Sequence, residues 1–555
     1  MKPSSAPSAK DHISRSSFRS DCPGLSFDDH RSGLRLQMDL RDSFRLAARN
    51  FPDKDCVVLE GKRFTYRQVI DRVDRLAGAM RRLGVAKGTR VGILQVNSIE
   101  YVECLYACLQ IGAILVPLNY KLKVNEIEYI VNQAGLTVLF LGERYIDLVE
   151  SVRAKTTTLA KCVCLERAAR GMTSYQSLID IPIDEAVYEP VDYCSVALIL
   201  YTSGTTGLPK GAMLSYRGLH HFALSMALSL KLDHNDRVLA GGPLYHVGTI
   251  GYLFPSLYVG ATWVMVPQFD ARQVLETIQR ERLTVCWFAP AMLNFMVQIE
   301  GSAVYNLNSL RMIQYGGGPM PTRVLKDASR LFGCKFMQIY GLTEAVPQTF
   351  LDPEDHILDE HDARYRQLSS IGKPAPNVEL RIVDIDGQDV AVGEIGEIVC
   401  RCDMVMEGYW QKPAETEQAI RAGWLHTGDL ARVDENGFVY LVDRMKDMII
   451  RGGENIYPAE IERILFDHPA IAEAAVIGVP DITWGECVKA FVVLRPSMHA
   501  TAEDVIRHCR DHLASYKKPA FVEFIDALPR TSGGKVLKTE LRSLHARRQA
   551  SLPTC

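Results

Sequence analysis

The chain has 555 residues, with 63 Lys and Arg against 66 Asp and Glu, which gives a formal charge of -3. With 47% hydrophobic and 23% charged residues, its composition is that of a globular protein and excludes a disordered chain, a collagen and a disulfide miniprotein. The length exceeds the roughly 250–300 residues at which a single hydrophobic core stops growing, so we expect several domains. The near-neutral charge gives no reason to expect a nucleic acid as partner.

The N-terminus and the cysteines bear on location. Residues 1–30 are rich in Ser and contain no apolar run, so they predict a flexible tail rather than a secretory signal. The 14 cysteines include no C-x-x-C pair, which disfavours structural zinc and favours a reducing, cytoplasmic location. No segment approaches the roughly 18 consecutive apolar residues of a membrane span. Peripheral membrane contact and a homodimer are both left open.

Apolar strands alternate with amphipathic helices from about residue 64 to residue 340. The expected helices are Tyr66–Leu83, Ile99–Gln110, Glu126–Ala134, Ala271–Arg282, Ala291–Gln298 and Pro321–Leu331. The expected strands include Arg90–Val96, Ala113–Pro117, Thr137–Leu141, Thr284–Phe288, Met312–Tyr315 and Phe336–Tyr340. This alternation predicts an α/β fold with mostly parallel sheets.

The pattern changes after about Ser370. Short strands with Gly and Asp turns predict a small β subdomain, and a compact α+β segment of roughly 110 residues follows it, a typical small-domain size. We therefore predict a flexible tail over 1–30, a large N-terminal domain over 31–442 and a small C-terminal domain over 443–555.

The strongest local signal is the segment Tyr201–Met213, YTSGTTGLPKGAM, directly after an apolar strand. Its glycines permit close backbone approach to a ligand, and its hydroxyls and backbone N–H groups can surround phosphate oxygens. Lys210 can add a positive charge. Because Gly211 and Ala212 follow that lysine, the segment is not a Walker A loop, and it lacks the G-x-G-x-x-G of dinucleotide folds.

This loop resembles the signature of the adenylate-forming enzymes, which comprise acyl- and aryl-CoA synthetases, luciferases and peptide-synthetase adenylation domains. Five further segments resemble that family's motifs in the family's order, and the resemblance covers about residues 40–545. These segments are GGGP at 316–319, QIYGLTEA at 338–345, WLHTGDL at 424–430, RGGENIYPAEIE at 451–462 and PRTSGGKVLKTEL at 529–541.

The resemblance implies an ATP site and its residues. The phosphate contacts would be Thr202, Ser203, Gly204, Thr205, Thr206, Gly207 and Thr343. The adenosine contacts would be Gly316, Gly317, Gly318, Tyr340, Gly341, Asp429 and Arg444, with Tyr340 on adenine and Asp429 on the ribose hydroxyls. Mg²⁺ would be held by Glu344 and Thr205, and Lys210, Glu344, His246 and Lys535 would be catalytic.

The resemblance also implies two half-reactions, in which a carboxylic acid and ATP give an acyl-adenylate and pyrophosphate, and CoA then displaces AMP. Between them the C-terminal domain would rotate about Lys446 to withdraw Lys535, and Gly452 and Gly453 would line the pantetheine tunnel. The implied activity is that of an AMP-forming acid–thiol ligase, with the acid, ATP and CoA as its small-molecule partners.

The acid is predicted less sharply. The segment at 243–260, PLYHVGTIGYLFPSLYVG, resembles the family's acyl-pocket motif, with His246, Val247 and Gly248 at the pocket and an apolar helix facing the acyl chain; a plain core helix is the alternative. No acidic residue lies between Arg237 and Phe269 to hold an ammonium group, which disfavours an amino acid. A medium- or long-chain fatty acid fits best, as in bacterial fatty-acyl-CoA synthetases. An aryl or sterol-side-chain acid, or transfer to a carrier-protein thiol, is the alternative.

Overall fold

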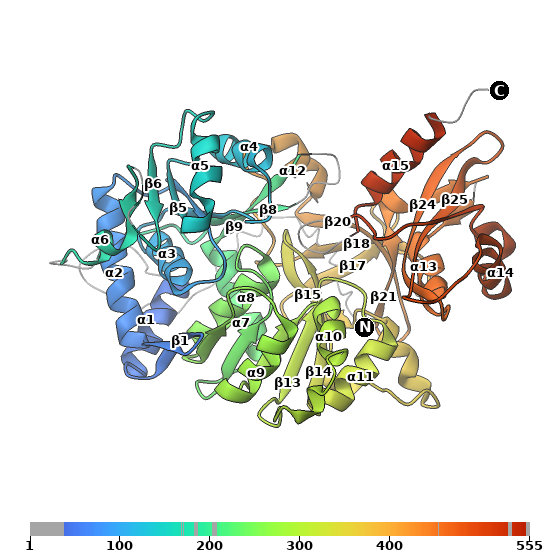
Figure 1. Ribbon diagram of the computed structural model, residues 1–555, viewed down its shortest axis with the longest axis horizontal. Coiled ribbons are helices and arrows are strands. Elements are labelled where there is room, and N and C mark those ends of the chain that lie inside the picture. The colour runs from blue at the N-terminus through green and yellow to red at the C-terminus, as the bar shows by residue number, and fades with distance from the viewer. Residues whose placement is uncertain are drawn as a thin grey trace, which may run out of the picture. The chain divides into compact units, whose positions relative to one another are not determined.

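The computed structural model describes residues 38–167, 169, 171–182, 187–202, 208–452, 454–530 and 536–550. The predicted tail over 1–30 lies outside these residues. The α/β class is confirmed: two large sheets, each parallel in its interior, carry helices between their strands (Figure 1).

The first large sheet has nine strands in the order β16-β15-β14-β13-β12-β10-β11-β1-β2. Its interior pairs are parallel, and only β2, β15 and β16 at the two edges pair antiparallel. The strands are β1 (Asp55–Leu59), β2 (Lys62–Thr65), β10 (Arg237–Ala240), β11 (Thr262–Met265), β12 (Val285–Phe288), β13 (Met312–Gly316), β14 (Lys335–Leu342), β15 (Ala345–Leu351) and β16 (Lys373–Pro374).

The second large sheet has seven strands in the order β7-β6-β5-β3-β4-β8-β9 and is parallel except for the β8–β9 hairpin. Its strands are β3 (Arg90–Leu94), β4 (Ile114–Pro117), β5 (Val138–Leu141), β6 (Lys161–Cys164), β7 (Thr173–Ser174), β8 (Val196–Thr202) and β9 (Lys210–Ser215). The continuous alternation in the sequence is therefore divided between two sheets.

Helices connect these strands. They are α1 (Leu40–Asn50), α2 (Tyr66–Arg82), α3 (Ile99–Gln110), α4 (Val124–Ala134), α5 (Ile146–Arg153), α6 (Tyr175–Ile179), α7 (Tyr216–Leu230), α8 (Val247–Tyr258), α9 (Ala271–Glu281), α10 (Pro290–Val297) and α11 (Thr322–Phe332). Side chains cap several first turns: those of Asp39, Thr65 and Ser98 accept hydrogen bonds from backbone N–H groups of α1, α2 and α3. Short 3-10 turns are η1 (Glu143–Tyr145), η2 (Ser302–Val304), η3 (Pro353–Asp355), η4 (Ala363–Ser369), η5 (Met445–Asp447) and η6 (Ser515–Lys517).

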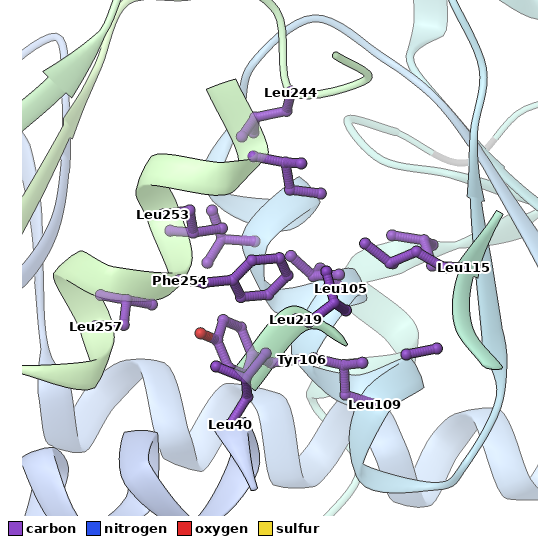
Figure 2. Packing of buried hydrophobic residues seen from close by; sticks show 14 of the residues in the cluster. Leu40, Leu105, Tyr106, Leu109, Leu115, Leu219, Leu244, Leu253, Phe254 and Leu257 are labelled. Atoms are coloured by element: carbon purple, nitrogen blue, oxygen red, sulfur yellow. The ribbon is translucent and has the colours of Figure 1, made fainter. Parts of the chain in front are cut away.

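The largest core joins helices from distant parts of the sequence. Figure 2 shows Leu253, Phe254 and Leu257 of α8 packed with Leu105 and Tyr106 of α3, and all five are buried. Much of the apolar surface of α8, expected to face an acyl chain, therefore lies in the protein core, which was the alternative interpretation of this segment.

The β subdomain is a five-stranded antiparallel sheet. It comprises β17 (Glu379–Val383), β18 (Gly396–Arg401), α12 (Pro413–Ala419), β19 (Ile420–Arg421), β20 (Trp424–Val433) and β21 (Val439–Arg444). Strand β21 continues two residues past the predicted boundary at 442/443, because Leu430 and Asp429 of β20 pair with Asp443 and Arg444.

The C-terminal segment, orange to red in Figure 1, has its own sheet and helices. They are β22 (Ile449–Arg451), β23 (Glu454–Ile456), α13 (Pro458–Phe466), β24 (Ile471–Asp481), β25 (Gly485–Leu494), α14 (Ala502–His512), β26 (Phe521–Phe524) and α15 (Lys538–Ala550). The β24–β25 hairpin contributes to two apolar clusters, one with Ile461 of α13 and Val505 of α14, the other with Leu541 of α15. The presence of this small C-terminal domain is thereby confirmed.

Candidate active site

The predicted phosphate loop joins two antiparallel strands. Thr202 ends β8 and pairs with Lys210 at the start of β9, and the Thr202 hydroxyl donates to the Lys210 carbonyl at 3.4 Å. The other predicted loop contacts, Ser203, Gly204, Thr205, Thr206 and Gly207, lie outside the described residues. The hairpin therefore fixes the two ends of the loop and places Lys210 at one of them.

Thr343 and Glu344 form the two-residue turn between β14 and β15, because Leu342 pairs with Ala345 across it. The Glu344 carboxylate accepts a hydrogen bond of 2.7 Å from the hydroxyl of Tyr409. The Lys210 ammonium lies 5.1 Å from the centroid of the same tyrosine ring, within cation–π range. Tyr409 thus brings two predicted catalytic residues from different sheets to one place.

The segment around Tyr409, residues 404–410, joins both neighbours through its backbone. Tyr409 forms an antiparallel bridge with Ala212 of β9. The backbone bonds are Met213 N to Gly408 O at 2.9 Å, Glu407 N to Met213 O at 2.9 Å, Trp410 N to Gly211 O at 2.8 Å and Met406 N to Glu344 O at 2.8 Å. We call residues 404–410 the bridging segment, since it hydrogen-bonds to β9 on one side and to the Glu344 turn on the other.

The predicted ribose residues form a second cluster. Asp429 on β20 is 4% exposed, and its carboxylate accepts from the Tyr340 hydroxyl at 2.7 Å and pairs with Arg444 at 2.5 Å. Burial and the Asp429 charge raise the pKa of Tyr340 well above its usual value, so the phenol stays a proton donor. Since each carboxylate oxygen can accept a second hydrogen bond, Asp429 still has capacity for ribose hydroxyls.

The glycines at 316–318 lie beside this cluster. A Cβ on Gly316 would come within 2.3 Å of the Ile339 carbonyl oxygen, so only glycine allows β13 this close to β14. At Gly317, whose φ is +80°, and at Gly318, a Cβ would meet nothing within 4 Å. Gly341 also permits a close approach, because a Cβ there would lie 2.8 Å from Val346. The 316–318 turn therefore exposes bare backbone next to Tyr340, as a flat base would require.

The predicted acyl-pocket residues begin α8. The Nδ1 atom of His246 accepts from the Gly248 N–H at 3.0 Å, which leaves Nε2 as the protonated nitrogen of a neutral ring. A Cβ at Gly248 would lie 3.0 Å from the Trp287 ring. Val247 and Thr343 both line an apolar cavity of about 10 Å³, and Phe222 forms another part of its wall. That volume holds about one water molecule.

The predicted hinge follows the ribose cluster directly. Lys446 lies in η5, and burial, with Arg444 and Arg542 nearby, lowers its pKa. Asp447 pairs with Arg542 of α15 at 2.9 Å. Gly452 has a φ of +59°, and the Trp484 ring covers it. Gly453 and Lys535 lie outside the described residues.

Comparisons with known proteins agree with this geometry. The family model described as AMP-binding enzyme matches residues 44–410, and the model of its C-terminal domain matches residues 460–535. The chain belongs to the AMP-binding enzyme family. It is thus an adenylate-forming enzyme, an AMP-forming acid–thiol ligase of the acyl- or aryl-CoA ligase kind.

Three relatives show the range of this family. A feruloyl-CoA synthase of an Amycolatopsis species is 37% identical over 498 residues, which are 89% of this chain and 96% of that protein. A long-chain-fatty-acid–CoA ligase of Mycobacterium tuberculosis is 34% identical over 87% of this chain and 93% of its own length. The structure of an anthranilate CoA ligase with anthranoyl-AMP has a TM-score of 0.84 at 29% identity and covers 94% of this chain and 99% of its own.

Two residues of this site were not predicted from the sequence. Tyr409 precedes the helix that begins at Pro413, and its only local signal is the preceding Gly408, which has a φ of +130°. In the sequence Trp287 is part of an apolar strand, and only the pairing of β12 with β10 places it beside α8.

No helix in the described part of the chain is long and apolar enough to cross a bilayer.

Proposed function

We propose that this ligase activates a compact aryl or aryl-alkyl carboxylic acid with ATP and transfers the acyl group to CoA. The observation that supports the choice of acid is the similarity to ligases named for aryl acids, the feruloyl-CoA synthase and the anthranilate CoA ligase. Rings occupy the space around the glycines of α8: Trp287 lies against Gly248, and a Cβ at Gly251 would come within 2.2 Å of Phe222. A flat acid needs less displacement of these walls than a long alkyl chain does.

In the first half-reaction a carboxylate oxygen of the acid attacks the α-phosphorus of ATP, and pyrophosphate leaves. Lys210 would offset negative charge at the phosphates, and His246 would donate its Nε2 proton toward the acid's carboxylate. Asp429, Arg444 and Tyr340 would hold the adenosine, so that the two anionic reactants are oriented before reaction.

A magnesium ion fits the residues that the structure describes. The Glu344 carboxylate supplies a hard oxygen donor, and Mg²⁺ is usually held by one or two carboxylates together with substrate phosphates. Among the described residues no group of three or more His, Cys, Asp or Glu forms a cage of its own. When bound, the ion would neutralise phosphate charge, and Glu344 with Thr205 would hold it.

In the second half-reaction the CoA thiol attacks the acyl carbon, the thioester forms and AMP leaves with the proton of the thiol released. The family resemblance implies that Lys535 acts in the first step and that Lys446 is the hinge of the movement that follows. Both assignments remain proposals. A medium- or long-chain fatty acid is the second candidate, supported by the 34% identity to a long-chain-fatty-acid–CoA ligase.

An acid panel tests the proposal. Benzoic, cinnamic, arylacetic and sterol-side-chain acids are compared with saturated fatty acids of 8 to about 16 carbons by kcat/KM for AMP release, with the thioester identified by mass spectrometry. We expect an aryl acid to exceed every fatty acid by at least about tenfold, which corresponds to ~1.4 kcal/mol. A fatty acid with the highest kcat/KM would overturn the choice of acid. Adenylate formation without any CoA thioester would favour a carrier-protein thiol as acceptor.

A further inference from the structure

The bridging segment points to a role for Tyr409 in the ATP site. We propose that Tyr409 is a positioning residue that keeps the Lys210 ammonium and the Glu344 carboxylate apart and oriented for a metal-bound nucleotide. This inference rests on the proposed adenylation function. Its observations are the 2.7 Å hydrogen bond to Glu344 and the 5.1 Å approach of Lys210 to the ring.

A tyrosine can contact both charges without neutralising either. The face of the ring carries partial negative charge and attracts the ammonium, whereas the hydroxyl donates a hydrogen bond to the carboxylate. The ion pairs within the described part of the chain do not include one between Lys210 and Glu344. If these residues paired directly, each would have to leave the other before binding phosphate or metal.

Hydrogen bonds hold the backbone of Tyr409 in place, and this fixes the position from which its ring extends. Its N–H donates to the Thr416 hydroxyl of α12 at 2.9 Å. The same hydroxyl donates to the Lys412 carbonyl at 2.8 Å, while Gly408 leaves no room for a Cβ, which would lie 2.6 Å from Thr416. Together with the bridge to Ala212, these contacts hold the residue from both sides.

The hydrogen bond can persist when a nucleotide binds. Only Oε1 of Glu344 accepts from the phenol, so Oε2 can bind a metal ion while Oε1 remains held. Hydrogen bonds that orient a ligating carboxylate commonly change metal affinity by about 10–100-fold.

Three variants test the inference, with Mn²⁺ as a spectroscopic substitute for Mg²⁺. Tyr409→Phe removes the hydroxyl and keeps the ring, whereas Tyr409→Leu removes both. Tyr440→Phe is the matched control. It deletes a hydroxyl that donates a 3.1 Å hydrogen bond to another carboxylate, that of Asp434, outside this site. Mn²⁺ affinity is measured by electron paramagnetic resonance with a non-hydrolysable ATP analogue, and binding of the analogue without metal by calorimetry.

We expect Tyr409→Phe to weaken Mn²⁺ binding at least about tenfold and to change metal-free analogue binding less than about twofold. Tyr409→Leu should weaken both, and Tyr440→Phe neither. Equal losses with and without metal for Tyr409→Phe would overturn the inference, as would unchanged Mn²⁺ affinity.

A double-mutant cycle controls for indirect effects on folding. If Tyr409 acts through Glu344, the Tyr409→Phe effect on analogue–Mn²⁺ binding should disappear in a Glu344→Gln background. An equal effect in both backgrounds would refute the proposed route. Failure of the proposed function differs from failure of this inference. In the first case the wild-type protein itself forms no AMP with any acid or binds no analogue–Mn²⁺ complex, and the inference fails with it. In the second case the wild-type protein does both, and only the Tyr409 variants give the contrary result.

Discussion

The hydroxyl of Tyr340 donates a 2.7 Å hydrogen bond to the carboxylate of Asp429, although 89 residues separate the two in sequence. Tyr340 lies on β14 of the nine-stranded sheet, and Asp429 lies on β20 of the β subdomain. Arg444 reaches the other carboxylate oxygen from the adjacent strand β21. The predicted nucleoside contacts are therefore connected to one another before any nucleotide binds.

Asp429→Asn should raise the KM for ATP by tenfold or more. The amide removes the negative charge that Arg444 faces, and hydrogen bonds to a charged group contribute about 1.5–3 kcal/mol each. Tyr340→Phe should have a smaller effect in the same direction, because it removes a single donor. The measurement is ATP-dependent AMP release at saturating acid, and a KM for Asp429→Asn within twofold of wild type would contradict the assigned role.

Lys535→Ala should abolish adenylation while sparing thioester formation from a synthetic acyl-adenylate. The lost ammonium would leave charge at the reacting phosphate uncompensated, which matters only in the first step. Lys538→Ala is the control, because that lysine is paired with Glu462 at 2.8 Å within the C-terminal segment. Equal loss of both half-reactions in Lys535→Ala would argue against a domain rotation that withdraws this lysine before the second half-reaction.

Lys446→Pro should slow thioester formation more than adenylation. Proline fixes φ near -65° and restricts the preceding residue, so it would limit rotation between β21 and β22. We expect at least about a tenfold loss in the second half-reaction and less than about threefold in the first. Lys446→Ala separates the backbone effect from loss of the side chain. Single-turnover kinetics give both rates, and an unchanged second step would exclude Lys446 as the hinge.

Because His356 is held with a lowered pKa, we expect the free energy of unfolding to depend on pH. Its ring nitrogens contact the Asp352 carbonyl at 2.8 Å and the Tyr315 hydroxyl at 3.0 Å, and burial lowers its pKa to about 4. An unfolded histidine has a pKa of about 6.5, so between these values the unfolded chain binds a proton that the folded chain does not. The stabilisation is complete above pH ~6.5 and is lost as the pH falls toward 4.

His356→Gln should therefore flatten the dependence of the unfolding free energy on pH between ~6.5 and ~4. Denaturant midpoints at several pH values provide the measurement. His361→Gln, at an exposed position nearby, should keep the slope of the wild-type protein. Parallel slopes for wild type and His356→Gln would show that another group carries the dependence.

The sequence predicts the local elements well because hydrophobic periodicity is a local signal. The helices at 99–110 and 271–281 and the strand at 285–288 lie within one residue of their expected bounds. Sheet membership was not predictable in this way: β1 pairs with β11, so that Val57 lies beside Trp263, and nothing near Val57 encodes that partner. The division of one alternating pattern into two sheets follows from such long-range pairings.

The site shows the same contrast. Lys210 lies in a segment with three glycines and four Ser and Thr hydroxyls, which stands out from the surrounding pattern, whereas Glu344 and Asp429 were assigned because QIYGLTEA and WLHTGDL resemble the family's motifs. Tyr409 lies in a segment with one glycine, and its importance depends on contacts with β9 and the Glu344 turn that only the folded chain shows. The role of the helix at 247–258 stays divided between core and acyl pocket, because an apolar run has the same appearance in a core and in a pocket wall.

The bridging segment also has a consequence for how the site forms during folding. Its backbone bonds join β9 of the seven-stranded sheet to the β14–β15 turn of the nine-stranded sheet, and it lies between β18 and α12 of the β subdomain. The amides of Met213, Met406 and Trp410 should therefore gain protection from hydrogen exchange together, in one cooperative step. Their shared exchange rate would report the fraction of molecules whose nucleotide site is assembled.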